Sequence, residues 1–206
     1  LLTYLVFSLL VFDGLGVEAS RAQSRFFDDR ALLSPVVAWA EVEGARVLGG
    51  GFTAATSVIE VAAFVGHISN PGAYRDESYT TISVSGRVAL RNQHEHTRGG
   101  VLLGPVLERV IGSGDQVDAT FLGLSSGAFV RILQLRHVVL APAFDTAVLF
   151  HVGSAVRRPL VVGAVSLGLA VGDARSILVL FDPSLSVSGA GGGRQIGLAV
   201  GLVVGV

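Results

Sequence analysis

The sequence predicts an all-β protein: a closed antiparallel transmembrane β-barrel of 8 to 10 strands with short loops. Three observations lead to this fold class. Half of the 206 residues are hydrophobic and only 15% are charged, whereas a soluble domain carries about 25% charged residues. Charged residues interrupt every apolar stretch before it reaches the roughly 20 residues that a spanning helix needs. Several segments instead alternate large apolar residues with small or polar ones, and a strand crosses a bilayer with only about 9–11 residues.

The composition also limits the chemistry. The chain has no cysteine, which excludes disulfides, iron–sulfur clusters, Cys-ligated zinc and thiol catalysis. Its net charge of −1 differs from the basic balance of a nucleic-acid-binding protein, so we expect no nucleic-acid partner. The length suits one domain with enough residues to bury a core.

The N-terminus has the pattern of a targeting segment. Residues 1–12 form an apolar run, and the small residues Ser20 and Ala22 fit the positions before a cleavage site. We interpret residues 1–22 as a signal peptide, complete or truncated; a buried first strand or helix is the alternative. Residues 23–33 are then a short segment before the barrel domain, which we expect to span residues 34–206.

The last segment, residues 196–206, shows the alternation most clearly. Large aliphatic side chains at every second position suit a face in contact with lipid, and small residues between them suit a crowded barrel interior. The residues that we expect to face lipid are Ile196, Leu198, Val200, Leu202 and Val204. Those that we expect to face inward are Gly197, Ala199, Gly201 and Gly205.

Residues 81–91 alternate apolar with polar residues, as a strand between lipid and a lumen does. We expect Ser83, Ser85, Arg87 and Arg91 to face the lumen. A half-exposed strand of a soluble protein is the alternative interpretation of this segment.

Clusters of Gly, Pro, Asn and Ser mark turns between such segments. They include residues 49–51, 70–72, 125–127, 141–142 and 189–193. These turns predict ten strands, or eight if one pair of segments is a single bent strand or a loop. The ten strands are expected near residues 36–47, 55–67, 79–91, 101–111, 117–124, 129–140, 146–156, 160–171, 176–188 and 195–206.

Several charged residues fall on the predicted inward faces. We expect Glu41, Glu43 and Glu60 to face the lumen together with Arg87 and Arg91. Because buried charges must be paired, we interpret them as an internal salt-bridge network that fills a closed barrel. The alternative is a narrow pore with selectivity rings, for which 8 to 10 strands leave little room.

The signal-like start, the alternating strands and the glycine-rich last strand resemble the small outer-membrane β-barrel proteins of Gram-negative bacteria. This resemblance is at the level of the class and covers residues 34–206. It implies an outer-membrane location, the lipid bilayer as a partner, and insertion by the barrel-assembly machinery. It also implies a periplasmic C-terminus and a periplasmic segment at residues 23–33. It does not name a family, because many functions share this scaffold.

One local motif suggests enzymatic chemistry. His67, Ser69 and Asn70, followed by Glu77, resemble the motif of the outer-membrane lipid A deacylase family. The resemblance implies His67 as general base, Ser69 as nucleophile and Glu77 as the group that orients the imidazole, a workable serine-hydrolase arrangement. Ser-Asn-Pro-Gly is also an ordinary turn sequence. Counting strands back from a periplasmic C-terminus places this turn on the periplasmic side, away from lipid A, so we interpret it as a turn.

A second polar cluster, His94-Glu95-His96, could suggest metal binding. In an extended chain only the two histidines share a face, whereas catalytic zinc takes three protein ligands and a water. We therefore expect a solvated loop, extracellular by the same strand count, with no metal and no cofactor. Residues 189–193 are expected to form a hairpin loop, because no Lys follows the glycines as in a phosphate loop.

The sequence thus favours a small, non-enzymatic outer-membrane β-barrel with a structural, surface-interaction or minor transport role. The first alternative is an outer-membrane lipid-modifying hydrolase that uses His67, Ser69 and Glu77. The second alternative is a secreted soluble β-sandwich or barrel. Heat-modifiable gel migration and detergent-dependent folding would separate the soluble alternative from the other two.

Overall fold

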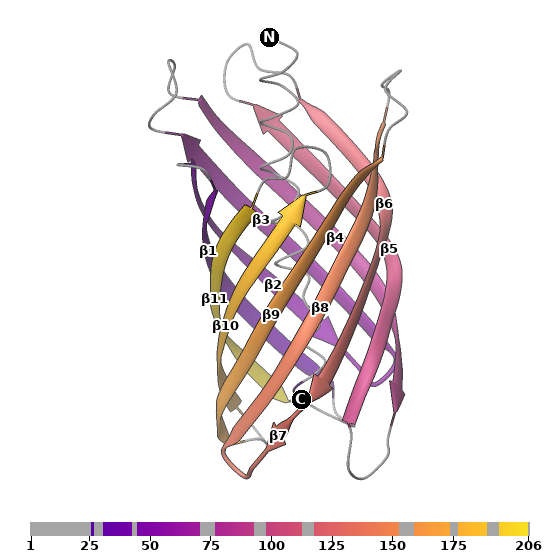
Figure 1. Cartoon of the computed structure of the whole chain (residues 1–206), viewed down its shortest axis with the longest axis vertical. Coiled ribbons are helices and arrows are strands. Elements are labelled where there is room, and N and C mark those ends of the chain that lie inside the picture. Colours follow the sequence, from indigo (N-terminus) through magenta and orange to yellow (C-terminus); the bar gives the residue numbers. More distant parts are fainter. Residues whose placement is uncertain are drawn as a thin grey trace.

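The computed structural model confirms the predicted all-β barrel (Figure 1). It describes residues 26, 31–42, 45–70, 77–92, 98–112, 118–152, 159–173, 177–188 and 194–205. Within these ranges, no helix is long and apolar enough to cross a membrane. The strands are β1 (Leu32–Val42), β2 (Ala45–Ala55), β3 (Ile59–Asn70), β4 (Glu77–Asn92), β5 (Arg98–Gly112), β6 (Ala119–Arg131), β7 (Leu133–Gln134), β8 (Val138–His151), β9 (Leu160–Asp173), β10 (Ile177–Ser188) and β11 (Arg194–Gly205).

Ten of the eleven strands form the wall of the barrel. Each wall strand pairs antiparallel with its neighbours in the chain, and the pairing of β1 with β11 joins the two ends of the sheet. The remaining strand, β7, has two residues and pairs with β8 just beyond the β6–β8 ladder. The barrel therefore has the larger of the two predicted strand numbers.

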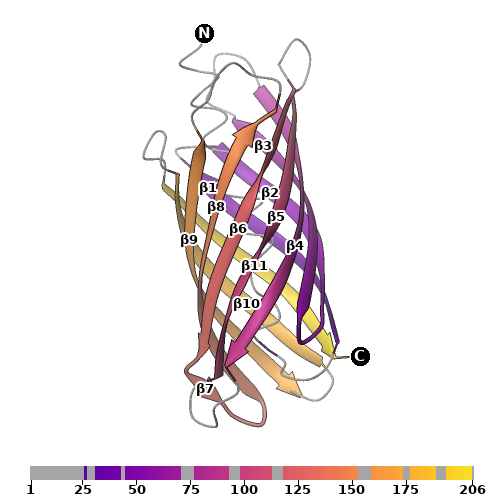
Figure 2. The ribbon, with the colours of Figure 1, turned by 90° about the vertical axis from the view of Figure 1, so that its right-hand side faces the viewer.

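The strands slant strongly around the barrel axis, as Figure 2 shows. A line drawn from a residue of β1 through its paired residues on successive strands returns to β1 about 12 residues away, which is the shear of the barrel. For strands about 4.8 Å apart, this stagger gives a tilt of about 40° and a radius of about 10 Å. Because the stagger is an even number of residues, inward and outward positions keep their alternation where the wall closes.

Side-chain burial follows this alternation. In β10, for example, Leu178, Leu180 and Asp182 are buried in the interior, whereas Ile177 and Val179 are exposed on the outside. A strand has a side-chain period of two, so a wall of ten strands presents one set of residues to the lumen and the other to the surroundings.

We call the end of the barrel at Leu32 and Gly205 the proximal rim and the opposite end the distal rim. The two largest apolar clusters of the described interior lie toward these rims, and polar residues lie between them. A third, smaller cluster consists of Ala89, Leu102, Phe129 and Ala143. The distal cluster includes Phe64, Ile68 and Phe121 together with Ala38, Ala40, Ala147 and Ala164. The proximal cluster consists of Phe26, Leu32, Val36, Ala55, Val139, Ala141, Ala170, Leu178, Leu180 and Val203.

Phe26, which precedes β1 in the sequence, packs inside the barrel. Its side chain is 2% exposed and belongs to the proximal cluster, among residues of the inner wall such as Leu178 and Leu180. The wall itself begins at Leu32, two residues before the predicted start at 34.

The predicted turn at residues 49–51 is wrong, because these glycines lie in the middle of β2. The turn instead falls between Val42 and Ala45, which form a cross-strand pair. The glycines serve packing: a Cβ on Gly49 would lie 2.4 Å from Cζ of Phe64, and one on Gly51 would lie 2.7 Å from Cδ2 of the same ring. Their hydrogen side chains let this inward-facing ring from β3 lie flat against the wall.

The predicted turns at 125–127 and 141–142 are also wrong, since these residues lie inside β6 and β8. Pro142 is tolerated within a strand because of where it lies. The register of β8 with β7 ends at Leu140, and its register with β6 begins at Ala143. The missing N–H of Pro142 therefore faces the gap between these two partners.

These corrections change the sides of two connections. The expected strands contain one too many between residues 117 and 156 and one too few between residues 36 and 67, so their total is right but their directions are not. In the structure β3 ends and β4 begins at the distal rim, opposite Gly205. The turn after Ser69 therefore lies away from the C-terminus, and the connection between β4 and β5 lies at the proximal rim, which reverses both predicted sides.

Replacing Gly51 with Val should destabilise the barrel by about 1–3 kcal/mol, the usual cost of overpacking an interior. The reason is that the new Cβ would lie 2.6 Å from the backbone oxygen of Ala63 and 2.7 Å from the Phe64 ring. Gly50→Val is the matched control, because its Cβ points outward and meets nothing nearer than an ordinary contact of 3.5 Å. Urea unfolding followed by Trp39 fluorescence measures both variants. Equal losses of stability would contradict this account of the glycines.

Candidate functional site

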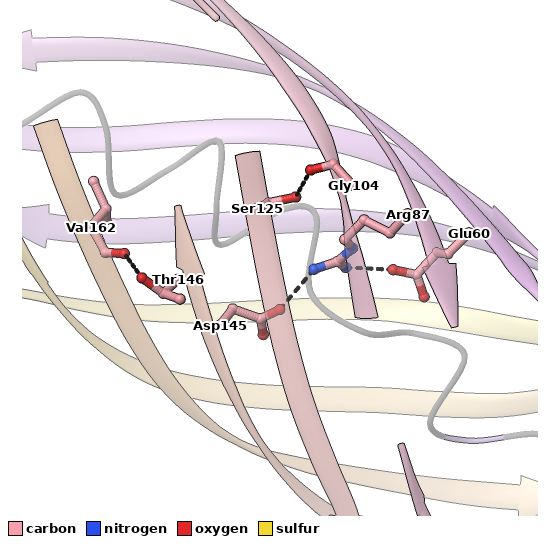
Figure 3. Close-up of polar contacts among 7 residues, drawn as sticks. All are labelled: Glu60, Arg87, Gly104, Ser125, Asp145, Thr146 and Val162. Atoms are coloured by element: carbon pink, nitrogen blue, oxygen red, sulfur yellow. Dashed lines mark hydrogen bonds and ion pairs between the residues drawn. The ribbon is translucent and has the colours of Figure 1, made fainter. Parts of the chain in front are cut away.

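The most distinctive interior feature is an ion-pair network that joins three strands (Figure 3). Arg87 on β4 donates from Nη1 to Oδ1 of Asp145 on β8 at 2.7 Å and from Nη2 to Oε1 of Glu60 on β3. All three side chains are at most 2% exposed. We call these three residues the Arg87 network.

Register and glycines allow one arginine to reach both carboxylates. Glu60 lies directly across from Arg87 on the neighbouring strand, whereas Asp145 lies on β8, beyond β5 and β6. The side chain crosses these two strands where they carry Gly104 and Gly127. A Cβ on Gly127 would lie 2.5 Å from Oδ1 of Asp145, and a Cβ on Gly104 would lie 2.8 Å from Cα of Arg87.

The surroundings of the network are polar but shielded from bulk water. Ser125 donates from Oγ to the backbone oxygen of Gly104 at 3.2 Å, beside the arginine (Figure 3). Isolated charges are costly to bury, and this cost is offset only when they are paired with good geometry. One guanidinium bonds both carboxylates and ties β3, β4 and β8 together across the lumen, while its Nε has no hydrogen-bond partner among the described residues.

Other buried polar residues continue the network into a belt around the lumen. They lie on β1, β2, β4, β6, β9 and β10, and the described members are Ser34, Thr53, Ser85, Ser125, Ser166, Asp182 and Ser184. Ser34 and Thr53 form a direct cross-strand pair, yet neither hydroxyl has a hydrogen-bond partner in the described part of the chain. The middle of the lumen is thus its most polar level.

The structure places the predicted lumen residues as follows. Glu60, Ser83, Ser85 and Arg87 are buried on the inward face, each at most 2% exposed. Glu41 is a correction: it lies on the exposed outward face of β1, because inward positions on this strand have even numbers. Glu43 and the side chain of Arg91 lie outside the described part of the structure.

Sequence reasoning missed Asp145 and left Glu108 undecided. Asp145 fell between two expected strands because Pro142 was interpreted as a turn. Alternation could have found it, since Asp145 continues the small inward residues Ala143 and Ala147 of β8. Glu108 and its neighbour cannot share a face; the structure buries Glu108 and directs Arg109 outward.

The last strand presents its large residues outward. Ile196, Leu198, Val200 and Leu202 are 37–65% exposed, and Val204 is partly exposed. On the other face Gly197 and Ala199 are buried, and Gly201 and Gly205 are partly buried where neighbouring strands approach closely.

The residues of the hydrolase motif are only partly brought together. His67 and Ser69 share the outward face of β3 close to the distal rim, and Glu77 pairs through the backbone with Asn70. Neither the His67 nor the Ser69 side chain makes a hydrogen bond in the described part of the structure. His94, Glu95 and His96 lie outside the described residues, and those that are described contain no group of three His, Asp or Glu that could hold a metal ion.

Comparison with known proteins finds similarity in fold. No protein-family model matches the chain, and no curated protein matches it. Among solved structures it is similar to the translocator domain of the autotransporter NalP from Neisseria meningitidis, with 13% identity, 98% of each chain covered and a TM-score of 0.50. Others are the transport unit of the autotransporter AIDA-I from Escherichia coli (10% identity, 93% of this chain and 97% of that chain, TM-score 0.42) and the CymD monoaromatic hydrocarbon channel (10% identity, 95% and 93%, TM-score 0.29). The first likeness, which concerns the fold alone, agrees with the class-level resemblance to outer-membrane β-barrels.

Replacing Arg87 with Met should lower the free energy of unfolding by about 3–5 kcal/mol, because two buried carboxylates lose the guanidinium that they share. Arg109→Met is the control: that arginine pairs with Asp118 at 3.5 Å, and both side chains are more than half exposed, so the loss should stay below about 1 kcal/mol. Equilibrium unfolding in urea measures both. The triple variant Glu60→Gln, Arg87→Met, Asp145→Asn should recover much of the loss, and a triple variant as unstable as Arg87→Met would contradict the explanation.

Proposed function

We propose that this protein is a small, non-enzymatic outer-membrane β-barrel with a structural or surface-interaction role, and with transport limited by the Arg87 network. Under this proposal residues 1–22 are a signal peptide, and the mature chain follows, with Phe26 packed in the proximal half of the lumen and the wall beginning at Leu32. The barrel-assembly machinery of a Gram-negative bacterium inserts the barrel, and the proximal rim faces the periplasm.

The observation that carries the proposal is the apolar exterior. Exposed large hydrophobic residues occur on the outward face of all ten wall strands, from Val37 on β1 to Leu202 on β11. A soluble protein rarely exposes an apolar patch of more than a few hundred Å². A continuous apolar surface around a closed barrel, with polar residues inside, is the arrangement that a bilayer favours.

The height of this surface fits a bilayer. In β9 the outward residues from Val161 to Val171 are all apolar or Gly. Ten residue steps of about 3.4 Å, tilted by about 40°, span about 26 Å, close to the roughly 25 Å apolar band of outer-membrane barrels. The outward hydroxyl of Thr146 within the band donates to the backbone oxygen of Val162 at 2.8 Å, so it needs no water (Figure 3).

Charged outward residues lie at the rims, where headgroups and water would meet them. At the distal rim, Arg109 pairs with Asp118, and Glu41 and Arg46 face each other across β1 and β2. At the proximal rim, Arg136 and His137 are exposed in the connection before β8. This distribution limits the apolar band at both ends.

The Arg87 network supports a closed barrel in preference to an open pore. A ten-stranded barrel of about 10 Å radius, measured at the backbone, holds little more than its own side chains. The network and the two apolar clusters occupy that interior, so we expect purified protein in planar lipid bilayers to show no large, steady conductance.

Replacing Val200 with Arg should destabilise the folded barrel in lipid by about 2–4 kcal/mol, the cost of a cation near the bilayer midplane. Val200 lies near the middle of the apolar band and is 37% exposed. Ile177→Arg is the matched control, because Ile177 begins β10 at the proximal rim, where the cost falls to about 0–1 kcal/mol. Folding into lipid vesicles at a series of urea concentrations, scored by heat-modifiable gel migration, measures both. Equal effects of the two variants, or folding without detergent or lipid, would contradict the membrane proposal.

A lipid-modifying hydrolase is the second candidate, and one observation favours it. His67 and Ser69 face outward at the distal rim, which under the proposed orientation is the side where lipid A lies. The strand boundaries predicted from the sequence place these residues on the periplasmic side instead. Against this candidate, neither side chain makes a hydrogen bond in the described structure, whereas an activated serine needs its base within hydrogen-bonding reach.

The Ser69→Ala variant separates the two candidates. We expect mass spectra of lipid A from cells expressing the wild type and the variant to be identical, and the barrel to lose at most about 1 kcal/mol of stability. A wild-type spectrum that lacks one acyl chain, with the chain restored in the variant, would show that the protein is a hydrolase and would overturn the non-enzymatic role.

A further inference from the structure

We propose that Glu108, Thr81 and Ser83 form a binding site for one monovalent metal cation of the size of Na⁺ in the distal half of the lumen. These residues face inward from the adjacent strands β4 and β5. The site is separate from the Arg87 network, and it goes beyond the proposed membrane role.

The carboxylate of Glu108 is buried but only half satisfied. Its side chain is fully buried, and Oε1 accepts a hydrogen bond from Oγ1 of Thr81 at 3.1 Å. Thr81 is itself fully buried. The second oxygen, Oε2 of Glu108, has no hydrogen-bond partner in the described part of the chain.

Ser83 supplies a second unsatisfied oxygen at the same place. It is 2% exposed, and its hydroxyl has no partner among the described residues. Ser83 and Glu108 form a direct cross-strand pair, which puts their Cβ atoms about 4.5–5.5 Å apart. Two buried polar side chains thus lie opposite each other, and each has an oxygen without a hydrogen-bond partner among the described residues.

The charge of Glu108 lacks a counter-ion from the described side chains. Arg87 is already engaged by Glu60 and Asp145, and Arg109 points outward to Asp118. On β5 and β6 the inward neighbours of Glu108 are apolar: Val106, Val110 and Phe121 belong to the distal cluster. If this carboxylate is ionised in such surroundings, a positive charge nearby stabilises it; without one, a proton neutralises it.

The donor set indicates the class of cation. A carboxylate and two hydroxyls are hard oxygen ligands, which suit alkali and alkaline-earth ions and not zinc or copper. One negative charge balances one monovalent cation, whereas protein sites for Ca²⁺ usually supply several carboxylates. The site lies four residues from Gly112 at the distal end of β5.

The test compares thermal unfolding of the folded, detergent-solubilised protein in NaCl and in choline chloride at equal concentration. Choline has the same charge as Na⁺, so the two salts screen charges equally. It is too large for the proposed site. We expect NaCl to raise the unfolding midpoint by about 2–4 °C. The rise should disappear in Glu108→Gln and shrink by at least half in Ser83→Ala. Ser125→Ala is the control and should keep the full rise, because its inward hydroxyl is used by the Gly104 oxygen.

Two outcomes would overturn the proposal: equal midpoints of the wild type in both salts, or a full rise retained in Glu108→Gln. If Glu108→Gln does not fold, the Ser83→Ala variant provides the test. An unchanged rise of its unfolding midpoint in NaCl would contradict the site. An infrared carbonyl band from a protonated carboxylic acid, present in wild type in NaCl and lost in Glu108→Gln, would also overturn it, because a proton would then neutralise Glu108. None of these outcomes bears on whether the barrel folds into lipid, so failure of the cation site would leave the membrane proposal standing.

Discussion

The closed ladder of ten strands is the constraint on which the rest of the structure depends. Because the stagger around the ring is even, every residue is committed to one of two faces, and a slip of one residue would reverse an entire strand. The wall therefore separates two environments. Apolar residues gather outside, and the charged residues that face inward must find partners within a radius of about 10 Å.

The Arg87 network meets that requirement with residues far apart in the chain. Glu60, Arg87 and Asp145 come from three strands, and their contact needs Gly104 and Gly127 on the two strands between β4 and β8. The glycines of this barrel thus have specific roles in packing. Those of β2 admit an aromatic ring, and Gly127 leaves space for a carboxylate.

The alternation of residues was enough to predict the barrel and the inward direction of Glu60 and Arg87, because side-chain period and hydropathy are local properties. The total of ten strands was right only because two errors in the strand boundaries cancelled. The strand boundaries were harder to predict. Gly49–Gly51 and Pro142 look like turns in the sequence, and only the position of Phe64 or the gap beside β7 explains why they lie within strands. Asp145 was missed because Pro142 was taken for a turn. The residue that pairs with a buried charge also depends on the register of strands that are distant in the sequence. The prediction that Glu41 faces the lumen was wrong for a related reason, since the misplaced first turn hid the end of β1.

The pairing of β1 with β11 has a consequence for how the chain folds. Leu32 and Gly205 are cross-strand neighbours although nearly the whole barrel sequence separates them, and contacts of such high sequence separation form slowly. Until the last strand arrives, β1 and β10 each present an open edge, which is a template for pairing with other chains. Loss of β11 would leave both edges permanently open, so a shortened chain would tend to aggregate instead of forming a smaller barrel.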